Sequence, residues 1–353
     1  MVQRSDVPAP CRPAMLHRRM TRTCIHWLVT VALIGDLLFS TAVWADPLRS
    51  GVQALESPAD SPFAQPDLRP DYTKEDERAR HDGRTTTKRQ PRTLLESLFG
   101  IEGDDRDREE PEGEGRINPD RPHLPEASTT VGKGRIVLES GYTFNDKGST
   151  FSSNSYPEAL LRVGMFADWF EFRIGQNFLS AEQTVGGVQT SISGAQDLYL
   201  GVKVALTEQK QYLPEIALIP QMTVPTGSRE VSAGRVLPGL NADSTWKIIK
   251  DFFSIELLVA ANRVPDGPNR AHVEFATGLT GVVNITRQLE TFVEWDAFYP
   301  LGVTDPMIGQ RHYGVGGLVY FVTNNLAIDI RAGAGLNKQA NDFLVGVGFA
   351  VRY

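Results

Sequence analysis

Twelve segments, spread from residue 134 to the C-terminus, show the two-residue alternation that is typical of β-strands. In one of them, for example, Phe170 and Phe172 flank the charged Glu171. Successive side chains of a strand point to opposite faces, so each segment has one apolar face and one polar or small face. Most of the segments exceed the ~9–11 residues that cross a bilayer at a tilt. They are 134–145, 156–166, 169–179, 196–207, 212–224, 241–250, 252–263, 271–284, 287–299, 311–322, 325–336 and 342–353.

The connections between these segments alternate in length. Short ones, such as 167–168 and 324–325, alternate with longer ones, such as 146–155, 180–195 and 225–240. Outer-membrane barrels have short periplasmic turns, longer outer loops and an even number of strands. A soluble β-sandwich has no reason to sort its connections in this way. The pattern therefore predicts an all-β fold, an antiparallel transmembrane β-barrel of about twelve strands.

The last segment has an apolar face that ends in an aromatic residue at the C-terminus. Phe349, Val351 and Tyr353 share this face, whereas the other face is small and carries one charge, Arg352. A final edge strand of a soluble sandwich would also show this alternation. In a barrel, these three residues are predicted to face lipid and to serve as the signal read by the barrel-assembly machinery.

The N-terminus predicts export. Residues 1–45 combine a basic region with an apolar run from 25 to 39 and small residues before Asp46, as in a secretory signal peptide. Both cysteines, Cys11 and Cys24, lie in this part. Because residues 1–45 hold five arginines and two aspartates, their removal takes the formal net charge from −7 to −10. An acidic mature chain disfavours nucleic acid as a partner.

Residues 46–132 have a different composition, rich in Pro, Asp, Glu and Arg with scattered apolar residues. Such a segment buries too little apolar surface to offset the entropy of ordering it. We therefore expect a disordered periplasmic linker, with a short helix at 93–101 that either forms transiently or docks on a partner. The predicted organisation is a signal peptide (1–45), this linker (46–132) and a barrel (133–353).

If the apolar faces look outward, the charged residues of the other face line the lumen. An Arg or Lys facing lipid at mid-depth costs ~2–4 kcal/mol, which fixes this parity. The charges either form a structural ladder of ion pairs or line a path for solutes that disfavours anions. The predicted lumen residues are Glu139, Arg162, Glu171, Arg173, Asp197, Lys203, Glu290, Glu294, Asp296, Asp329, Arg331 and Arg352.

A catalytic site is not indicated by the sequence. An outer-membrane lipase or protease is the enzymatic alternative, and a lipase needs Ser and His within hydrogen-bond reach. His272 and His312 begin non-adjacent segments, and the strand between them offers no serine at matching height. No cluster has metal-ligand spacing, and no phosphate-binding loop is present. We therefore predict no enzyme activity and no cofactor.

Several short motifs together resemble the outer-membrane transporter family labelled MetA-pathway of phenol degradation. The resemblance covers residues ~130–353 and implies a twelve-stranded barrel in the outer membrane that transports small, aromatic or hydrophobic, compounds. The alternative is a structural barrel, tethered to a periplasmic partner through residues 46–132. The motifs are RIVLESGY (135–142), YPEALLR (156–162), EFRIG (171–175), DLYLG (197–201), LTEQKQYLP (206–214) and PTG (225–227).

Overall fold

The computed structural model describes residues 91–100, 115–266, 270–303 and 308–353. The expected signal peptide lies outside these residues. A short helix, α2 (Leu94–Phe99), falls within the range 93–101. The Thr93 side chain caps its first turn by accepting a hydrogen bond from the backbone N–H of Glu96. Gly100 ends the helix in the left-handed conformation that favours glycine.

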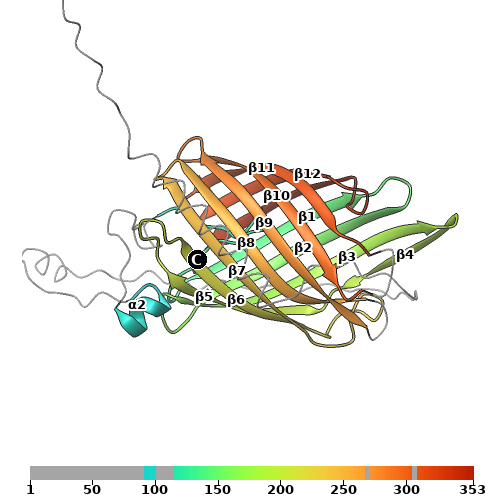
Figure 1. Cartoon of the computed structure of the whole chain (residues 1–353), viewed down its shortest axis with the longest axis horizontal. Helices are drawn as coiled ribbons and strands as arrows, with labels where there is room; N and C mark the ends of the chain where they lie inside the picture. The colour runs from blue at the N-terminus through green and yellow to red at the C-terminus, as the bar shows by residue number, and fades with distance from the viewer. Residues whose placement is uncertain (1–90, 101–114, 267–269, 304–307) are drawn as a thin grey trace, which may run out of the picture. The chain divides into compact units, whose positions relative to one another are not determined.

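The strands form one closed antiparallel barrel, which confirms the predicted fold class (Figure 1). Each strand pairs with its sequence neighbour, and β1 pairs with β13 to close the sheet. The strands are β1 (Ile136–Asp146), β2 (Phe151–Gly164), β3 (Phe170–Val185), β4 (Val188–Ala195), β5 (Leu198–Thr207), β6 (Glu215–Val224), β7 (Leu237–Ile249), β8 (Phe253–Pro265), β9 (Ala271–Asn284), β10 (Leu289–Leu301), β11 (Arg311–Thr323), β12 (Leu326–Gly335) and β13 (Phe343–Arg352).

Thirteen strands make a twelve-stranded barrel because β4 and β5 pair with successive halves of β3. β4 pairs with residues 178–185 of β3, and β5 pairs with residues 170–175. Residues 180–195, expected as a loop, are thus mostly a β-hairpin that turns at Gly186 and Gly187, both with positive φ. The first connection is also shorter than expected, since β1 and β2 are separated only by residues 147–150.

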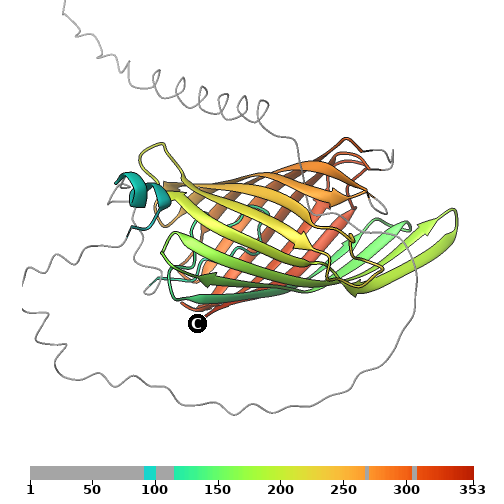
Figure 2. The same ribbon diagram turned by 90° about the horizontal axis from the view of Figure 1, so that it is seen from below.

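The two ends of the barrel differ. We call the end that holds the turns at 165–169, 250–252 and 324–325 the short-turn end, and the C-terminus lies there with α2 (Figure 1). The β3–β4 hairpin projects from the opposite end, called here the hairpin end (Figure 2). The longer connections, such as 225–236 between β6 and β7, also lie at the hairpin end.

The two faces of the wall follow the sequence alternation. Outward side chains are apolar and exposed, as for Val293, of which 74 % is exposed. Inward side chains include buried charges, among them Glu171 and Lys203, both 0 % exposed. A wall that presents apolar groups outward and polar groups inward is the arrangement of membrane barrels. Within the described residues, no helix is long and apolar enough to cross a membrane.

Candidate functional site in the barrel lumen

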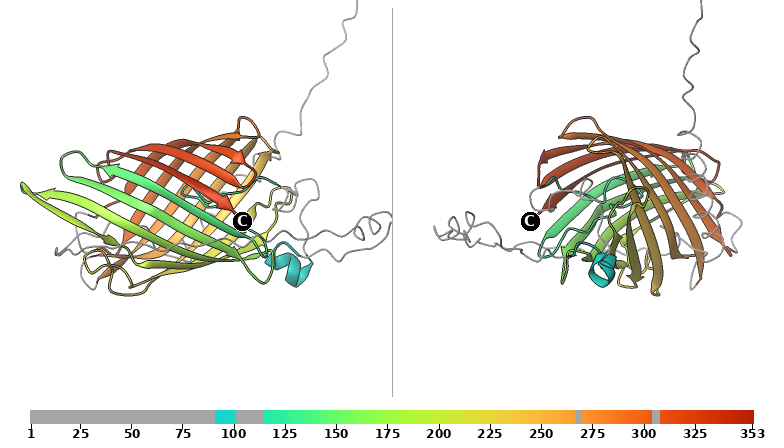
Figure 3. Two further views of the ribbon diagram at one scale, coloured as in Figure 1. Left: turned by 180° about the vertical axis from the view of Figure 1, so that it is seen from behind. Right: turned by 60° about the vertical axis from the view of Figure 1, so that its left-hand side comes forward.

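Residues 115–134, which we call the inner loop, lie inside the barrel (Figure 3). The loop enters at the short-turn end, where the backbone N–H of Ile117 donates to the carbonyl of Asn324. It returns to the same end, where the N–H of Gly134 donates to the carbonyl of Gly164. The inner loop is therefore re-entrant, and it occupies part of what the sequence predicted as a linker up to residue 132.

Asp120 of the inner loop is surrounded by three buried cations of the wall. Its carboxylate lies 2.7 Å from Lys203 Nζ, 2.9 Å from Arg173 Nη2 and 3.3 Å from Arg162 Nη1. Arg162, Arg173 and Lys203, which we call the basic cluster, project from β2, β3 and β5. Burial alone would raise the pKa of Asp120, but the three cations outweigh it and hold the pKa well below its usual range.

Wall carboxylates complete this network. Arg162 Nη1 donates to Glu139 at 2.9 Å, and Arg162 Nε donates to Glu171 at 2.8 Å. Arg173 also contacts Glu126 of the inner loop. Because a buried charge is costly unless it is paired, each member depends on the others. The predicted ladder of ion pairs is thus a three-dimensional cluster with an inner-loop residue at its centre.

The opposite side of the lumen is acidic. Asp243, Glu256, Glu290, Glu294 and Asp296, on β7, β8 and β10, form what we call the acidic wall. The inner loop offers it donors rather than acceptors. Arg116 Nη2 lies 2.9 Å from Glu290, and the backbone N–H groups of Leu124 and Glu126 donate to Glu294 and Asp243. The inner loop is therefore charge-complementary to both sides of the lumen.

His123 at the tip of the inner loop also faces the acidic wall. Its Nδ1 lies 3.2 Å from Glu256, and its ring packs edge-on against Phe292. Burial alone would lower the pKa of His123, but Glu256, with Glu294 and Glu290 beyond it, outweighs burial and raises the pKa to about 9. The imidazole is therefore cationic at neutral pH.

Glycines of the wall make room for Arg121. Gly141 and Gly348 face each other across β1 and β13, and a Cβ on either would lie 2.4 Å from the Arg121 guanidinium. Arg121 Nη1 donates to Glu158 at 2.6 Å, and its Nε lies 3.4 Å from Asp329. The small face of the closing strand thus lets an arginine of the inner loop lie flat against the wall.

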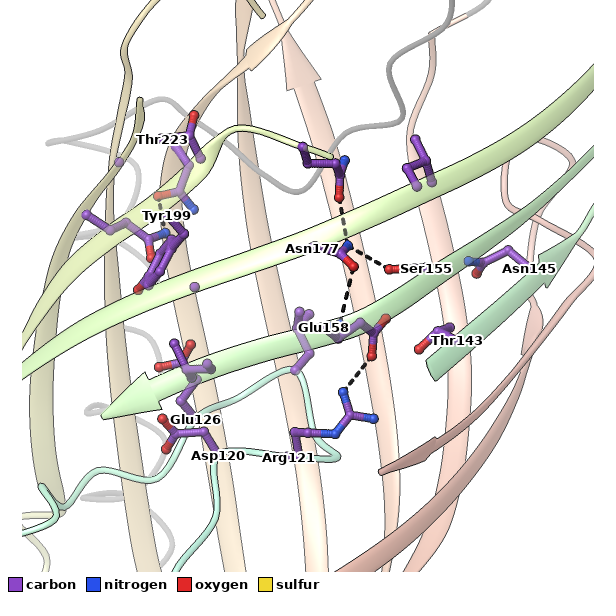
Figure 4. Close-up of a pocket in the computed structure, with 18 of the residues that line it drawn as sticks. Asp120, Arg121, Glu126, Thr143, Asn145, Ser155, Glu158, Asn177, Tyr199 and Thr223 are labelled. Atoms are coloured by element: carbon purple, nitrogen blue, oxygen red, sulfur yellow. Dashed lines mark hydrogen bonds and ion pairs between the residues drawn. The ribbon is translucent and has the colours of Figure 1, made fainter. Parts of the chain in front are cut away.

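A cavity of about 500 Å³ lies on the hairpin side of the inner loop (Figure 4). The tip of the inner loop, from Asp120 to Leu124, contributes its floor. Its walls combine apolar, amide and charged side chains, as is usual for sites that bind small molecules. The walls include Leu160, Asn177, Tyr199, Thr223, Asp296, Phe298 and Tyr313.

The aromatic Tyr199 lies flat against the wall of this cavity. It pairs with Gly175 across β3 and β5, and a Cβ on Gly175 would lie 3.1 Å from its ring. A Cβ on Gly201 would lie 2.6 Å from its hydroxyl. Two glycines, one in each of the motifs 171–175 and 197–201, therefore leave space for this ring.

The remaining predicted lumen residues also lie along the interior. Asp197 accepts hydrogen bonds from the backbone of Gly227 and Ala233 at the hairpin end. Arg331 donates to the carbonyl of Pro122, and Arg352 donates to that of Gly115. The predicted assembly residues lie on the last strand, where Phe349 is 39 % and Tyr353 77 % exposed.

The sequence did not point to the inner-loop residues of the site, Asp120, Arg121 and His123, nor to Asp243 on β7. The available signal was weak. Pro119, Pro122 and Pro125 recur every third residue, and proline removes the N–H that a ladder strand needs. Among the described residues, no group of three His, Cys, Asp or Glu side chains is arranged to hold a metal ion.

A closed barrel with an apolar exterior, a charged lumen and an inner loop defines the class as an outer-membrane-type β-barrel. Within that class, the chain belongs to the family described as "Putative MetA-pathway of phenol degradation", whose sequence model matches residues 119–353. This match confirms the resemblance and begins inside the inner loop. No curated protein sequence matches the chain.

Solved structures share the fold at low sequence identity. An outer-membrane channel from Pseudomonas putida F1 is 13 % identical, with a TM-score of 0.54 over 65 % of this chain and 99 % of that one. The NanC porin is 12 % identical, with a TM-score of 0.40 over 61 % and 98 %. The CymD monoaromatic hydrocarbon channel is 8 % identical, with a TM-score of 0.35 over 63 % and 89 %.

Proposed function

We propose that this protein is a passive channel of the outer membrane for small solutes, including aromatic ones. The observation that carries the proposal is the cavity of about 500 Å³ inside a closed barrel whose outer surface is apolar. Solutes enter from the hairpin end, which faces outward, and residues 1–45 direct export. The short-turn end and the inner loop then face the periplasm, in keeping with the topology of such barrels.

The family description and the cavity lining support aromatic solutes. Tyr199, Phe298 and Tyr313 all line the cavity, and the rings of Phe298 and Tyr313 lie 6.0 Å apart. Aromatic side chains favour offset or edge-to-face contacts with another ring. The amides of Asn177 and Gln196 supply hydrogen-bonding groups on the same surface.

Planar-bilayer recordings and proteoliposome swelling test the channel. We expect stepwise conductance, and swelling by a small aromatic alcohol that exceeds swelling by a disaccharide. Replacement of Tyr199 and Phe298 by alanine is expected to reduce the preference for the aromatic solute. A barrel that inserts yet passes neither ions nor solutes would refute the proposal.

A tethered, partner-binding barrel is the second candidate, and α2 favours it. Leu98 and Phe99 are 63 % and 69 % exposed near the short-turn end. In this case α2 would dock on a periplasmic protein. Replacing Leu98 and Phe99 by serine would then abolish capture of that protein, and conductance would be unaffected.

A further inference from the structure

We infer that the acidic wall is a binding site for an organic cation, such as an alkyl- or arylammonium solute, and that the inner loop occupies this site. The inference rests on the proposed channel function and names the class of solute that one side of the lumen selects. It starts from the difference between the two sides of the lumen.

The basic cluster has counterions within the wall itself. Arg162 pairs with both Glu139 and Glu171, at 2.9 Å and 2.8 Å. These pairs persist when the inner loop moves, because all three residues belong to strands β1, β2 and β3. The basic cluster therefore remains largely compensated without the inner loop.

The acidic wall obtains its cationic partners from the inner loop. Arg116 pairs with Glu290 at 2.9 Å, and His123 pairs with Glu256 at 3.2 Å. Backbone N–H groups of the loop serve Glu294 and Asp243. When the loop moves away, these carboxylates lose these donors together, so a charged solute is needed to replace them.

Unmet hydrogen-bonding capacity points to the same place. One carboxylate oxygen of Asp243 and one of Asp296 are buried without a hydrogen-bond partner in the described structure. The Nε2 of His123, a side chain only 8 % exposed and aimed at these acids, is also without one. The inner loop thus fills the site with the right charge but leaves acceptors free for a better donor.

The neighbouring surface favours an apolar body on the cation. Asp296 pairs across the sheet with Tyr313, and Phe298 follows Asp296 on the same face of β10. An aromatic face attracts an ammonium group and packs against a ring. An arylammonium ion therefore matches both the carboxylates and the aromatic side chains above them.

The test compares three probes of similar size: benzylammonium, benzyl alcohol and benzoate. Each is titrated calorimetrically into the purified full-length protein and into Asp120→Asn, which loosens the inner loop. We expect benzylammonium to bind best, and to bind Asp120→Asn more tightly than the wild type, because loop and ligand compete for the same carboxylates. The double variant Glu294→Gln/Asp296→Asn should lower its affinity by about tenfold.

Glu182→Gln is the matched control, since it removes a carboxylate from the β3–β4 hairpin, away from the acidic wall. Its affinity for benzylammonium should equal that of the wild type. Benzoate binding as well as benzylammonium, or no binding of benzylammonium to either protein, would overturn the cation site. A barrel that binds benzylammonium but conducts nothing would contradict the channel proposal alone.

Discussion

The short-turn half of the lumen is filled, whereas the hairpin half is hollow. In the filled half, Asp120 meets Arg162, Arg173 and Lys203 in a cluster from which solvent is excluded. In the hollow half, the same wall carries amides, hydroxyls and aromatic rings around a cavity of about 500 Å³. One closed sheet therefore combines a rigid, ion-paired section with a section that is open to a ligand.

This contrast shows how one wall can serve stability and recognition at different depths. Charged groups that are buried and paired rigidify the section they occupy, since removing one partner leaves the others uncompensated. Neutral polar groups beside a cavity lose little when altered, because water or a solute can satisfy them. Substitutions in the two halves should consequently differ greatly in their effect on folding.

The largest effect is expected for Arg162→Met. The substitution leaves Asp120, Glu139 and Glu171 buried with one counterion fewer, which costs about 3–5 kcal/mol of unfolding free energy. Urea unfolding of the detergent-solubilised barrel, followed by tryptophan fluorescence, measures the loss. Thr223→Ala in the hollow half is the control, with an expected change within about 0.5 kcal/mol. Equal losses in both variants would remove the distinction between the halves.

A disulfide can test whether the filled half must move for solutes to pass. The hydroxyls of Ser128 in the inner loop and Thr245 on β7 lie 2.9 Å apart. Beyond residue 45 the chain has no cysteine, so Ser128→Cys/Thr245→Cys introduces a unique pair. Oxidation is expected to abolish most solute flux, and a reducing agent should restore it.

The matched control joins two wall strands without touching the inner loop. Asn145 and Ser153 are cross-strand partners on β1 and β2, so Asn145→Cys/Ser153→Cys staples the wall alone. Flux through this variant should not respond to oxidation. If the oxidised Ser128–Thr245 variant keeps its full flux, the inner loop is a fixed part of the pore.

A smaller effect is expected from the glycines that accommodate Arg121. In Gly348→Ala the new Cβ would lie 2.4 Å from Arg121 Nε and 2.8 Å from Asp329, so the guanidinium must shift. Overpacking of this kind costs about 1–3 kcal/mol. Faster hydrogen exchange of residues 115–134, with unchanged exchange in the strands, would show that the inner loop loosens selectively. Gly316→Ala is the control, because its nearest neighbour would be 3.3 Å away.

The strands and their faces could be predicted from the sequence because alternation reports directly which side of a strand meets lipid. Glu171 and Arg173, for instance, were assigned inward from their neighbours alone. The even strand count also followed, since β4 and β5 continue a single stave of the barrel. The 180–195 hairpin was missed because it crosses no membrane and needs no apolar face.

The inner loop could not be predicted for a physical reason. Its polar groups are satisfied by residues far away in the sequence, such as Asp243 and Asp329, rather than by neighbours. A segment of this kind has no periodicity and buries little apolar surface of its own, so it has the composition of a disordered linker. The small face of the last strand was noticed, but its role in holding Arg121 required the register.

The smallest effect concerns His123 and distinguishes the two sides of the filled half by pH. Its pKa is raised from an ordinary 6.5 to about 9, so its pairing with Glu256 contributes fully below pH 6.5 and is lost as the pH rises through about 9. Arg116 and the arginines opposite keep their charge over this range. Hydrogen exchange around residues 121–126, corrected for its intrinsic pH dependence, should therefore accelerate modestly between pH 6.5 and 9.5. His123→Gln should show faster exchange already at pH 6.5 and no further pH response, and an unchanged response in this variant would assign the titration to another group.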